Sequence, residues 1–317
     1  MATSGSTDFT VTRNDIVKSA LQKVGKVREG GTPTATQYTE GSLALNILVK
    51  AYHGLGMPLW AMKTGYILPQ TGVNDIDVGP TGDHVTNSYV QTALASAAVS
   101  GAGSIVVDSA TGISASDNIG IELDNGDVQW TTVNGAPSGT TITLTATLTN
   151  AAAVDNTVYT YTTKTSRPLR ITHAYIKNVD NSEYQIDVIG RNDYFALGDK
   201  TTESVPSQIY YDHQLTDGVI SIWPRFEDGD NVIRFTYHRP FEDFDASTDN
   251  PDFPQAWIRP LVWGLTYELA PEAGLQLAER QQLYQEVYGK NGILELALDS
   301  DTEYLSLYFQ PNIDAAP

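Results

Sequence analysis

Five histidines carry the most versatile side-chain chemistry in this sequence, because imidazole binds metals and transfers protons near neutral pH. They are scattered along the chain, and no two share the i, i+4 spacing that places two zinc ligands on one helix face. We therefore expect ordinary surface or strand histidines and no metal site. The five are His53, His84, His173, His213 and His238.

Motifs for nucleophilic or phosphate chemistry are missing as well. The sequence has no GxSxG elbow, no GxxxxGK[ST] loop and no strand–GxGxxG–helix unit. Carboxylates are numerous, so two of them could lie at the separation found in glycosidases. A cell-wall hydrolase side activity therefore stays open. Asp124, Asn125 and Asp127 lack the regular spacing of a calcium loop and indicate a turn. We predict no catalytic residue, no cofactor and no enzyme.

Aromatic side chains offer a second kind of chemistry, since their rings can stack on sugars. At strand or helical core positions such rings are more often packing residues, which is the interpretation we favour. A carbohydrate-binding module stays open as the alternative, because Trp130, Tyr159 and Tyr161 fall in one β-rich block. The tryptophans concerned are Trp130, Trp223, Trp257 and Trp263.

Length and composition indicate a folded protein of roughly two domains at about 150 residues each. The 317 residues are 41% hydrophobic and 18% charged, a balance typical of globular chains. The absence of cysteine excludes disulfides and thiolate metal sites and fits assembly in a cytoplasm. No run of about eighteen apolar residues and no signal peptide pattern occurs, so we expect no membrane association.

Charge is strongly negative and unevenly distributed. Nineteen Lys and Arg face thirty-eight Asp and Glu, for a formal charge of −19, which opposes broad contact with nucleic acid phosphates. Residues 1–60 carry six basic and four acidic groups, whereas residues 240–317 carry three and fourteen. The two ends could pair within a ring or between subunits, or the acidic groups could simply form a solvated surface.

Helical periodicity marks both ends of the chain. Thr12 precedes apolar residues spaced three and four apart up to Val24, and Gly25 is suited to end that helix. A second amphipathic segment runs from Leu43 to Leu55. Two stripes after Pro254 predict a further helix with a kink or a late start, because Pro260 lies inside it. Another helix follows Gly274 and is interrupted at Asn291-Gly292.

The middle of the chain reads as β structure. Five short strands rich in Val, Ile and Thr are predicted between residues 104 and 163, with Asn125-Gly126 as a hairpin turn. More strands follow between 167 and 240, and a single helical turn is expected in RNDYFALGD. In VIRFTYH, alternation predicts that Ile233, Phe235 and Tyr237 face a core.

These patterns predict an α+β fold with a helical bundle built from the N- and C-terminal helices. The β-rich middle would contain an inserted small Ig-like sandwich or barrel. The domains expected are a helical/β core of residues 1–90 and 165–300, an inserted β domain of residues 91–164, and an extended C-terminal tail of residues 301–317.

Three segments resemble the head-to-tail adaptor (tail accessory factor) family of short-tailed bacteriophages, the podoviruses. They are SLALNILVKAYHGLGMPLWAMKTGYIL, RPFEDFDASTDNPDFPQAWIRPLVWGLTYELAPEAG, and YFQP within LSLYFQPNID. The second segment is the most specific, because it combines an FP dipeptide, spaced tryptophans and an LAPE helix break. The β block from GSIVVDS to YTTK departs from the minimal adaptor pattern and looks like an added module.

The resemblance implies a structural connector in the virion, located at the head–tail interface after assembly in the host cytoplasm. Such proteins form a ring, commonly of twelve copies, that docks on the portal after DNA packaging and retains the genome. The ring also forms a channel for double-stranded DNA, without sequence-specific binding, and a platform for nozzle or tail-spike proteins. Carried over to this chain, the portal contact would be Leu305, Leu307, Tyr308, Phe309, Gln310 and Pro311.

An acidic surface also suits a DNA conduit, because like charge reduces adhesion of the passing phosphates. This hypothesis requires that acidic residues of the C-terminal helices face the channel. The candidates are Glu268, Glu272, Glu279 and Glu286.

Overall fold

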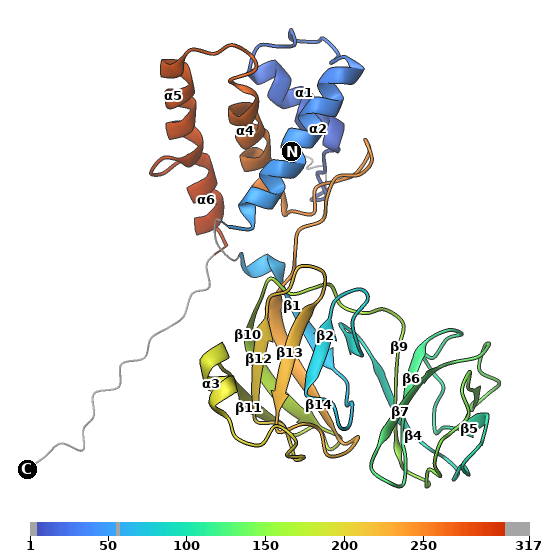
Figure 1. Ribbon diagram of the computed structural model, residues 1–317. Helices are drawn as coiled ribbons and strands as arrows, with labels where there is room; N and C mark the ends of the chain where they lie inside the picture. Colours follow the sequence, from blue (N-terminus) through green and yellow to red (C-terminus); the bar gives the residue numbers. More distant parts are fainter. Residues whose placement is uncertain (1–4, 55–57, 302–317) are drawn as a thin grey trace, which may run out of the picture. The chain divides into compact units, whose positions relative to one another are not determined.

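The computed structural model describes residues 5–54 and 58–301, and the chain forms two compact units (Figure 1). Residues 1–61 and 241–317 belong to the helical unit, and residues 62–240 belong to the sheet unit. The predicted α+β class is confirmed, because helices dominate the first unit and strands the second. No helix among the described residues is long and apolar enough to cross a bilayer.

Helices from both ends of the chain build the helical unit. Two short 3₁₀ turns, Leu59–Ala61 and Gln255–Trp257, accompany its α-helices. The α-helices are α1 (Arg13–Lys23), α2 (Ala35–Tyr52), α4 (Ile258–Leu269), α5 (Leu277–Tyr288) and α6 (Ile293–Asp299).

The first two helices begin at capping boxes. The side chain of Thr12 accepts a hydrogen bond from the backbone of Asp15, whose carboxylate accepts one from the Thr12 backbone at 3.0 Å. Gly25, at φ +82°, follows the end of α1 as predicted. Helix α2 starts earlier than its apolar spacing indicates, because Thr34 and Gln37 form a second capping box.

Helix α4 lies at the centre of the helical unit and packs against α1, α2, α5 and α6. Leu261, Leu265 and Leu269 are almost fully buried in the core that α4 shares with α1 and α2. The late start expected for this helix is confirmed, since it begins at Ile258. Pro260 therefore lies in the first turn, where no backbone N–H is needed for an intrahelical bond.

Helices α5 and α6 follow α4 and are separated by a short break. Asn291 has φ +60° and Gly292 caps α6, which confirms the interruption predicted there. Val287 is fully buried, and Leu294 packs into the core that contains Leu261. Both helices are thus held by apolar contacts on one side only.

The sheet unit is built around an eight-stranded, mostly antiparallel sheet in the order β2-β13-β12-β11-β10-β14-β1-β3. A short helix, α3 (Arg191–Ala196), packs on β12 where a single turn was predicted. The strands are β1 (Met62–Ile67), β2 (Asp75–Val78), β3 (Val85–Thr86), β10 (Arg170–Asn178), β11 (Glu183–Val188), β12 (Gln208–Asp212), β13 (Gly218–Trp223) and β14 (Asn231–His238).

The two edge strands of this sheet, β2 and β3, follow one another in the chain, and the sheet nearly closes into a barrel. Strands β2 and β3 flank one loop, in which the Asp83 backbone N–H donates to Asp77 O at 2.7 Å. The Asp77 N–H donates to the Asp83 carboxylate at 2.8 Å. The loop between β2 and β3 therefore lies at the position where further strand pairing would close the barrel.

Alternation in β14 follows the sequence prediction. Ile233, Phe235 and Tyr237 are fully buried in the core of the eight-stranded sheet. Gly65 on the paired strand β1 leaves room for the Phe235 ring, since a Cβ there would lie 2.5 Å from Phe235 Cζ. A larger residue at this position would displace the ring.

Residues 90–161 form two further sheets with a separate core. The five strands predicted between 104 and 163 are present, and Asn125-Gly126 forms the turn of the β6–β7 hairpin as expected. The four-stranded sheet has the order β4-β9-β6-β7, and β5 pairs with β8. The strands are β4 (Val90–Ala93), β5 (Ser104–Val106), β6 (Asn118–Glu122), β7 (Val128–Thr132), β8 (Thr141–Thr143) and β9 (Thr157–Tyr161).

Candidate interaction surface

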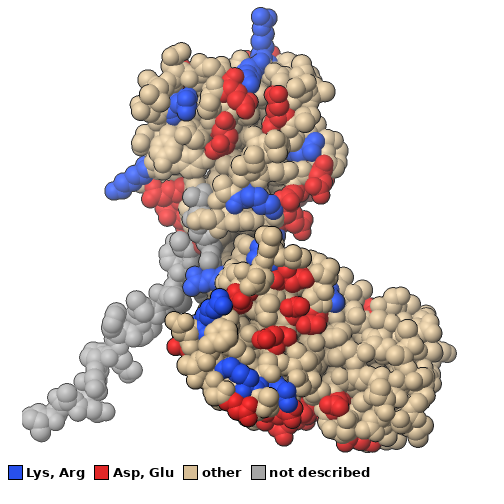
Figure 2. All heavy atoms as spheres, viewed as in Figure 1, with Lys and Arg blue, Asp and Glu red and all other residues tan. Residues whose placement is uncertain are grey.

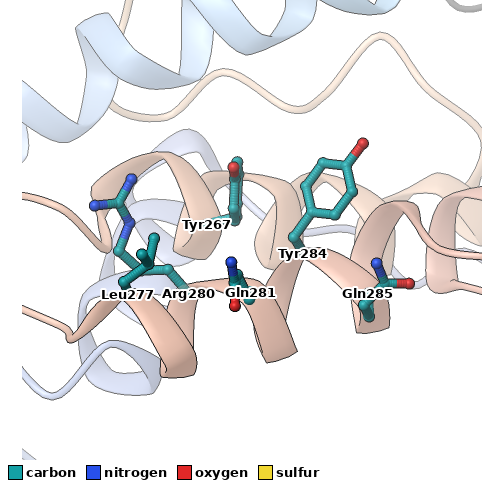
Figure 3. Close-up of a pocket in the computed structure, with 6 residues that line it drawn as sticks. All are labelled: Tyr267, Leu277, Arg280, Gln281, Tyr284 and Gln285. Atoms are coloured by element: carbon teal, nitrogen blue, oxygen red, sulfur yellow. The ribbon is translucent and has the colours of Figure 1, made fainter.

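A hollow of about 390 Å³ lies on the surface of the helical unit, between α4 and α5 (Figure 3). Tyr267 reaches it from α4, and the other lining residues project from one side of α5. The Tyr267 ring lies 5.7 Å from that of Tyr284 and 5.5 Å from that of Tyr288. The lining residues are Tyr267, Leu277, Arg280, Gln281, Tyr284 and Gln285.

Two side chains that line this α4–α5 hollow, one polar and one apolar, lack the contacts that such side chains usually make. The Nε atom of Arg280 is buried and has no hydrogen-bond partner among the described residues. Leu277 is 65% exposed although it begins the helix that carries the hollow. A buried guanidinium donor without a partner is unfavourable, so the hollow is suited to receive an acceptor and apolar atoms.

An apolar ridge lies on α2 and faces away from the core. Leu43 and Ile47 are 64% and 60% exposed, although the sequence placed both on the apolar side of this helix. The buried face of α2 is formed instead by Leu45, Leu48 and Val49. Apolar side chains therefore cover more of the helix circumference than a single stripe. Large aliphatic side chains at i and i+4 on a solvent face are typical of a surface that another protein covers.

The four carboxylates proposed to line a channel do not form one row. Glu279 and Glu286 lie seven residues apart on α5, hence about two turns apart on one exposed face. Glu272 pairs instead with Lys26 at 3.6 Å. Burial raises the pKa values of Glu268, Tyr52 and Tyr288, and the nearby Glu268 charge adds to the rise at both tyrosines.

The six residues predicted to contact a portal, Leu305, Leu307, Tyr308, Phe309, Gln310 and Pro311, lie outside the described residues. Their covalent connection is nevertheless placed, because α6 ends at Asp299. The Asp301 carboxylate accepts a hydrogen bond from the backbone N–H of Leu59 at 2.6 Å. The start of the tail is thus attached to the helical unit.

Charged side chains are distributed unevenly over the face shown in Figure 2, where one lobe of the sheet unit is almost free of Lys and Arg. Residues 91–163 contain six acidic and no basic residues. Such a surface repels phosphates, as the strongly negative charge of the whole chain does.

The three rings of the β-rich block that were considered for sugar stacking pack against other parts of the sheet unit. Trp130 stacks on His84 with ring centroids 3.8 Å apart, and its indole N–H donates to Pro69 O at 3.0 Å. Tyr161 contacts the same pair, and its hydroxyl lies 2.9 Å from His84 Nδ1. Tyr159 is buried and donates to Gly229 O at 2.6 Å. These contacts use the ring faces that a sugar would need.

The sheet unit has a second, polar hollow of about 350 Å³ beside this aromatic cluster. The hydroxyl oxygen of Tyr89 is buried and has no hydrogen-bond partner in the described part of the chain. Burial raises the pKa of Tyr89 to about 12, and the Lys177 ammonium lies 5.9 Å from its ring centroid. The lining residues are Tyr66, Asn87, Ser88, Tyr89, Gln91 and Lys177.

Histidines and carboxylates form no metal centre in the described ranges, where no three His, Asp or Glu are arranged to hold an ion. Asp124, Asn125 and Asp127 form the turn expected of them, with the Asn125 amide donating to Asp127 at 2.6 Å. His84 is half-buried, and its partial burial together with Lys164 lowers its pKa to about 4.

Comparison with known proteins gives one informative match. The family model of the SU10 adaptor protein matches residues 125–306, more than half of the chain. No curated protein matches significantly.

Two solved structures share local similarity with the chain. They are the Gp54 tailspike of Acinetobacter baumannii bacteriophage AP22, in complex with a capsular saccharide of that bacterium (18% identity, TM-score 0.23), and the Pseudomonas phage phi297 tailspike gp61 (20% identity, TM-score 0.20). The matches cover 25% and 23% of this chain, but only 16% and 14% of the tailspikes, so they carry no argument about its role.

The matched range runs from β7 through the sheet unit to α6 and past the end of the described residues. It therefore includes the α4–α5 hollow and the segment that the sequence resemblance identified as most specific. Because this match covers more than half of the chain, the chain belongs to the SU10 adaptor protein family of phage head–tail adaptors, and it is a structural component of a phage virion.

Proposed function

We propose that this chain forms the connector ring between the portal and the tail of a bacteriophage, with twelve copies as the expected number. The ring docks after DNA packaging, retains the genome, surrounds the path of the DNA and presents a platform for nozzle or tail-spike proteins. The main support for this proposal is the family match across residues 125–306, a range that includes much of the sheet unit and helices α4–α6.

Portal docking is assigned to the C-terminal tail. Residues 305–311 combine aromatic and aliphatic side chains, which gain affinity when they enter grooves of a partner. The attachment of Asp301 to the Leu59 backbone supports this assignment, because it fixes where the tail leaves the helical unit. The helices of that unit would act as a bundle that anchors twelve such tails.

The decisive experiment is co-sedimentation of the intact chain with its cognate portal ring, compared with a chain that ends at Thr302. We expect binding by the intact chain and its loss on truncation. A Tyr308→Ala/Phe309→Ala variant should bind weakly, whereas the matched control Asn312→Ala/Ile313→Ala should bind normally. Failure of the intact chain to bind any portal would refute the connector proposal.

Residues 91–164 are proposed to form a module inserted into the adaptor core, which is residues 1–90 and 165–300. Support comes from the separate hydrophobic core of this segment and from the pairing of Val90 with Thr160, which brings its two ends together. Removal of the module should therefore leave the eight-stranded sheet and portal binding intact.

A carbohydrate-binding virion module is the second candidate, and the polar hollow beside Tyr89 favours it. Tyrosine rings, amides and one ammonium group are the side chains that commonly bind saccharides through stacking and hydrogen bonds. Binding of the intact chain to a glycan array, abolished by Tyr89→Ala and preserved in the exposed control Thr81→Ala, would support this function. An array without binding would eliminate it and leave the connector proposal unaffected.

A further inference from the structure

An exposed apolar ridge and a hollow of the helical unit lie on different sides of α4. The apolar ridge is on α2, and the hollow is between α4 and α5. Helix α5 packs on α4 and α6, whereas α2 packs on α1 and α4 (Figure 1). One copy therefore cannot place its own ridge in its own hollow.

We propose that the ridge of one copy, Leu43 and Ile47, occupies the α4–α5 hollow of a second copy. The contact is heterologous, because each copy contributes a different surface, and repetition of such a contact leads to rings when the rotation closes. This interface rests on the ring proposed above and specifies which residues join neighbouring subunits.

The size and lining of the hollow suit this occupant. Its volume of about 390 Å³ exceeds the ~150 Å³ that already accommodates a benzene-sized group. Leu277 and the rings of Tyr267 and Tyr284 supply apolar contacts, and Tyr284 is 45% exposed in a single copy. Covering the exposed Leu, Ile and Tyr side chains is favourable, because it removes apolar surface from water.

Charged residues also favour the pairing of the ridge with the hollow. Glu40 lies three residues before Leu43 on the exposed side of α2, where its carboxylate can pair with the guanidinium of a neighbour's Arg280, which lines the hollow. The surrounding segments also differ in sign, because residues 1–60 carry six basic and four acidic groups and residues 271–301 carry two and six.

The complete absence of cysteine makes the test direct, since introduced cysteines are the only thiols in the chain. A full-length Leu43→Cys/Gln281→Cys variant, oxidised alone and on the portal ring, should give a ladder of disulfide-linked species larger than dimers. Each single variant should give no such ladder. A disulfide dimer of Leu43→Cys alone, or no ladder from the double variant, would overturn the proposed interface.

A charge exchange tests the same contact without covalent trapping. Glu40→Arg and Arg280→Glu should each abolish the ladder in the double-cysteine background, and the two together should restore it. Leu215→Glu, at a side chain that is 94% exposed in the sheet unit, is the matched control and should leave the ladder unchanged. Failure of the combined exchange to restore the ladder would refute the Glu40–Arg280 pairing.

The portal experiment separates this inference from the proposed function. Normal co-sedimentation of intact protein with the portal, together with an absent ladder, would reject the interface and leave the connector role standing. Absent co-sedimentation together with a ladder would show self-association of this geometry in a protein that has another role.

Discussion

At the scale of single residues, His84 has the most unusual environment in the sheet unit. It stacks on Trp130 and contacts the Tyr161 hydroxyl, and burial lowers its pKa from 6.5 to about 4. Between these pH values the His84 imidazole is therefore protonated in the unfolded chain and neutral in the folded chain. Stability is consequently full above about pH 6.5 and declines as the pH falls toward 4.

The loss of unfolding free energy attributable to His84 should reach about 3 kcal/mol near pH 4. About 2 kcal/mol of this loss should already be present at pH 5. Urea denaturation at pH 7.5 and pH 5, followed by tryptophan fluorescence, measures it. His84→Phe keeps an aromatic ring in the stack and should reduce the pH dependence, whereas His173→Phe, on the exposed part of β10, should retain it. Equal pH dependence in all three proteins would contradict this assignment.

Glu279 and Glu286 are the two channel candidates that share one exposed face of α5. If they face the DNA path, Glu279→Lys/Glu286→Lys should attract phosphates and slow DNA release from reconstituted particles. The effect should weaken as salt is raised. Asp108→Lys/Asp187→Lys changes the net charge equally in the sheet unit and serves as the control. Equal release rates for both variants would place the α5 carboxylates away from the DNA.

At the scale of elements, helix α4 is held by contacts that leave no space at one position. A Cβ on Gly264 would lie 2.4 Å from the Tyr52 hydroxyl and 3.0 Å from Leu48. The Tyr52 hydroxyl cannot withdraw freely, because it donates to Pro260 O at 3.1 Å. Gly264 thus permits the close approach of α2 and α4.

Gly264→Ala should destabilise the protein by up to about 2 kcal/mol, because overpacking costs about 1–3 kcal/mol and the higher helix propensity of alanine offsets only ~1 kcal/mol of it. Thermal unfolding followed by the helical circular dichroism signal measures the change. Gly198→Ala introduces a Cβ that meets nothing within 4 Å and should be close to neutral. A variant at Gly264 that is as stable as the parent would disprove the packing argument.

Local signals in the sequence predicted most of these elements. Caps at Thr12 and the break at Asn291-Gly292 are determined by neighbouring residues, so they could be predicted from sequence. The early start of α2 could have been found from the spacing of Thr34 and Gln37. Strand order could not, because pairings such as β13 with β2 join residues about 140 positions apart.

The α4–α5 hollow and the exposure of Leu43 also escaped sequence analysis. Periodicity identifies apolar residues on a helix but does not say how many helices are available to cover them. Leu43 and Ile47 therefore resembled core residues until the positions of α1 and α4 were known. Likewise, Trp130 could have been a sugar platform or a packing residue, and only the ring of His84 decides between them.

At the scale of the whole molecule, the sheet unit has both of its ends at one place. Met62 pairs with His238, so the chain enters and leaves the unit on adjacent antiparallel strands. We predict that residues 62–240 expressed alone fold into a cooperative β protein. Guanidinium denaturation followed by circular dichroism tests this, and a spectrum of an unfolded chain would contradict it.

The position of the sheet unit between α2 and α4 in the sequence also determines when the helical unit is completed on the ribosome. Helices α1 and α2 emerge first, but their partner α4 follows roughly 200 residues later, or about 10–40 s at usual rates of translation. During that interval Leu45 and Leu48 have no α4 to cover them, whereas the sheet unit can already fold. The helical unit is therefore the last part to mature, and nascent chains are exposed to aggregation until α4 is synthesised.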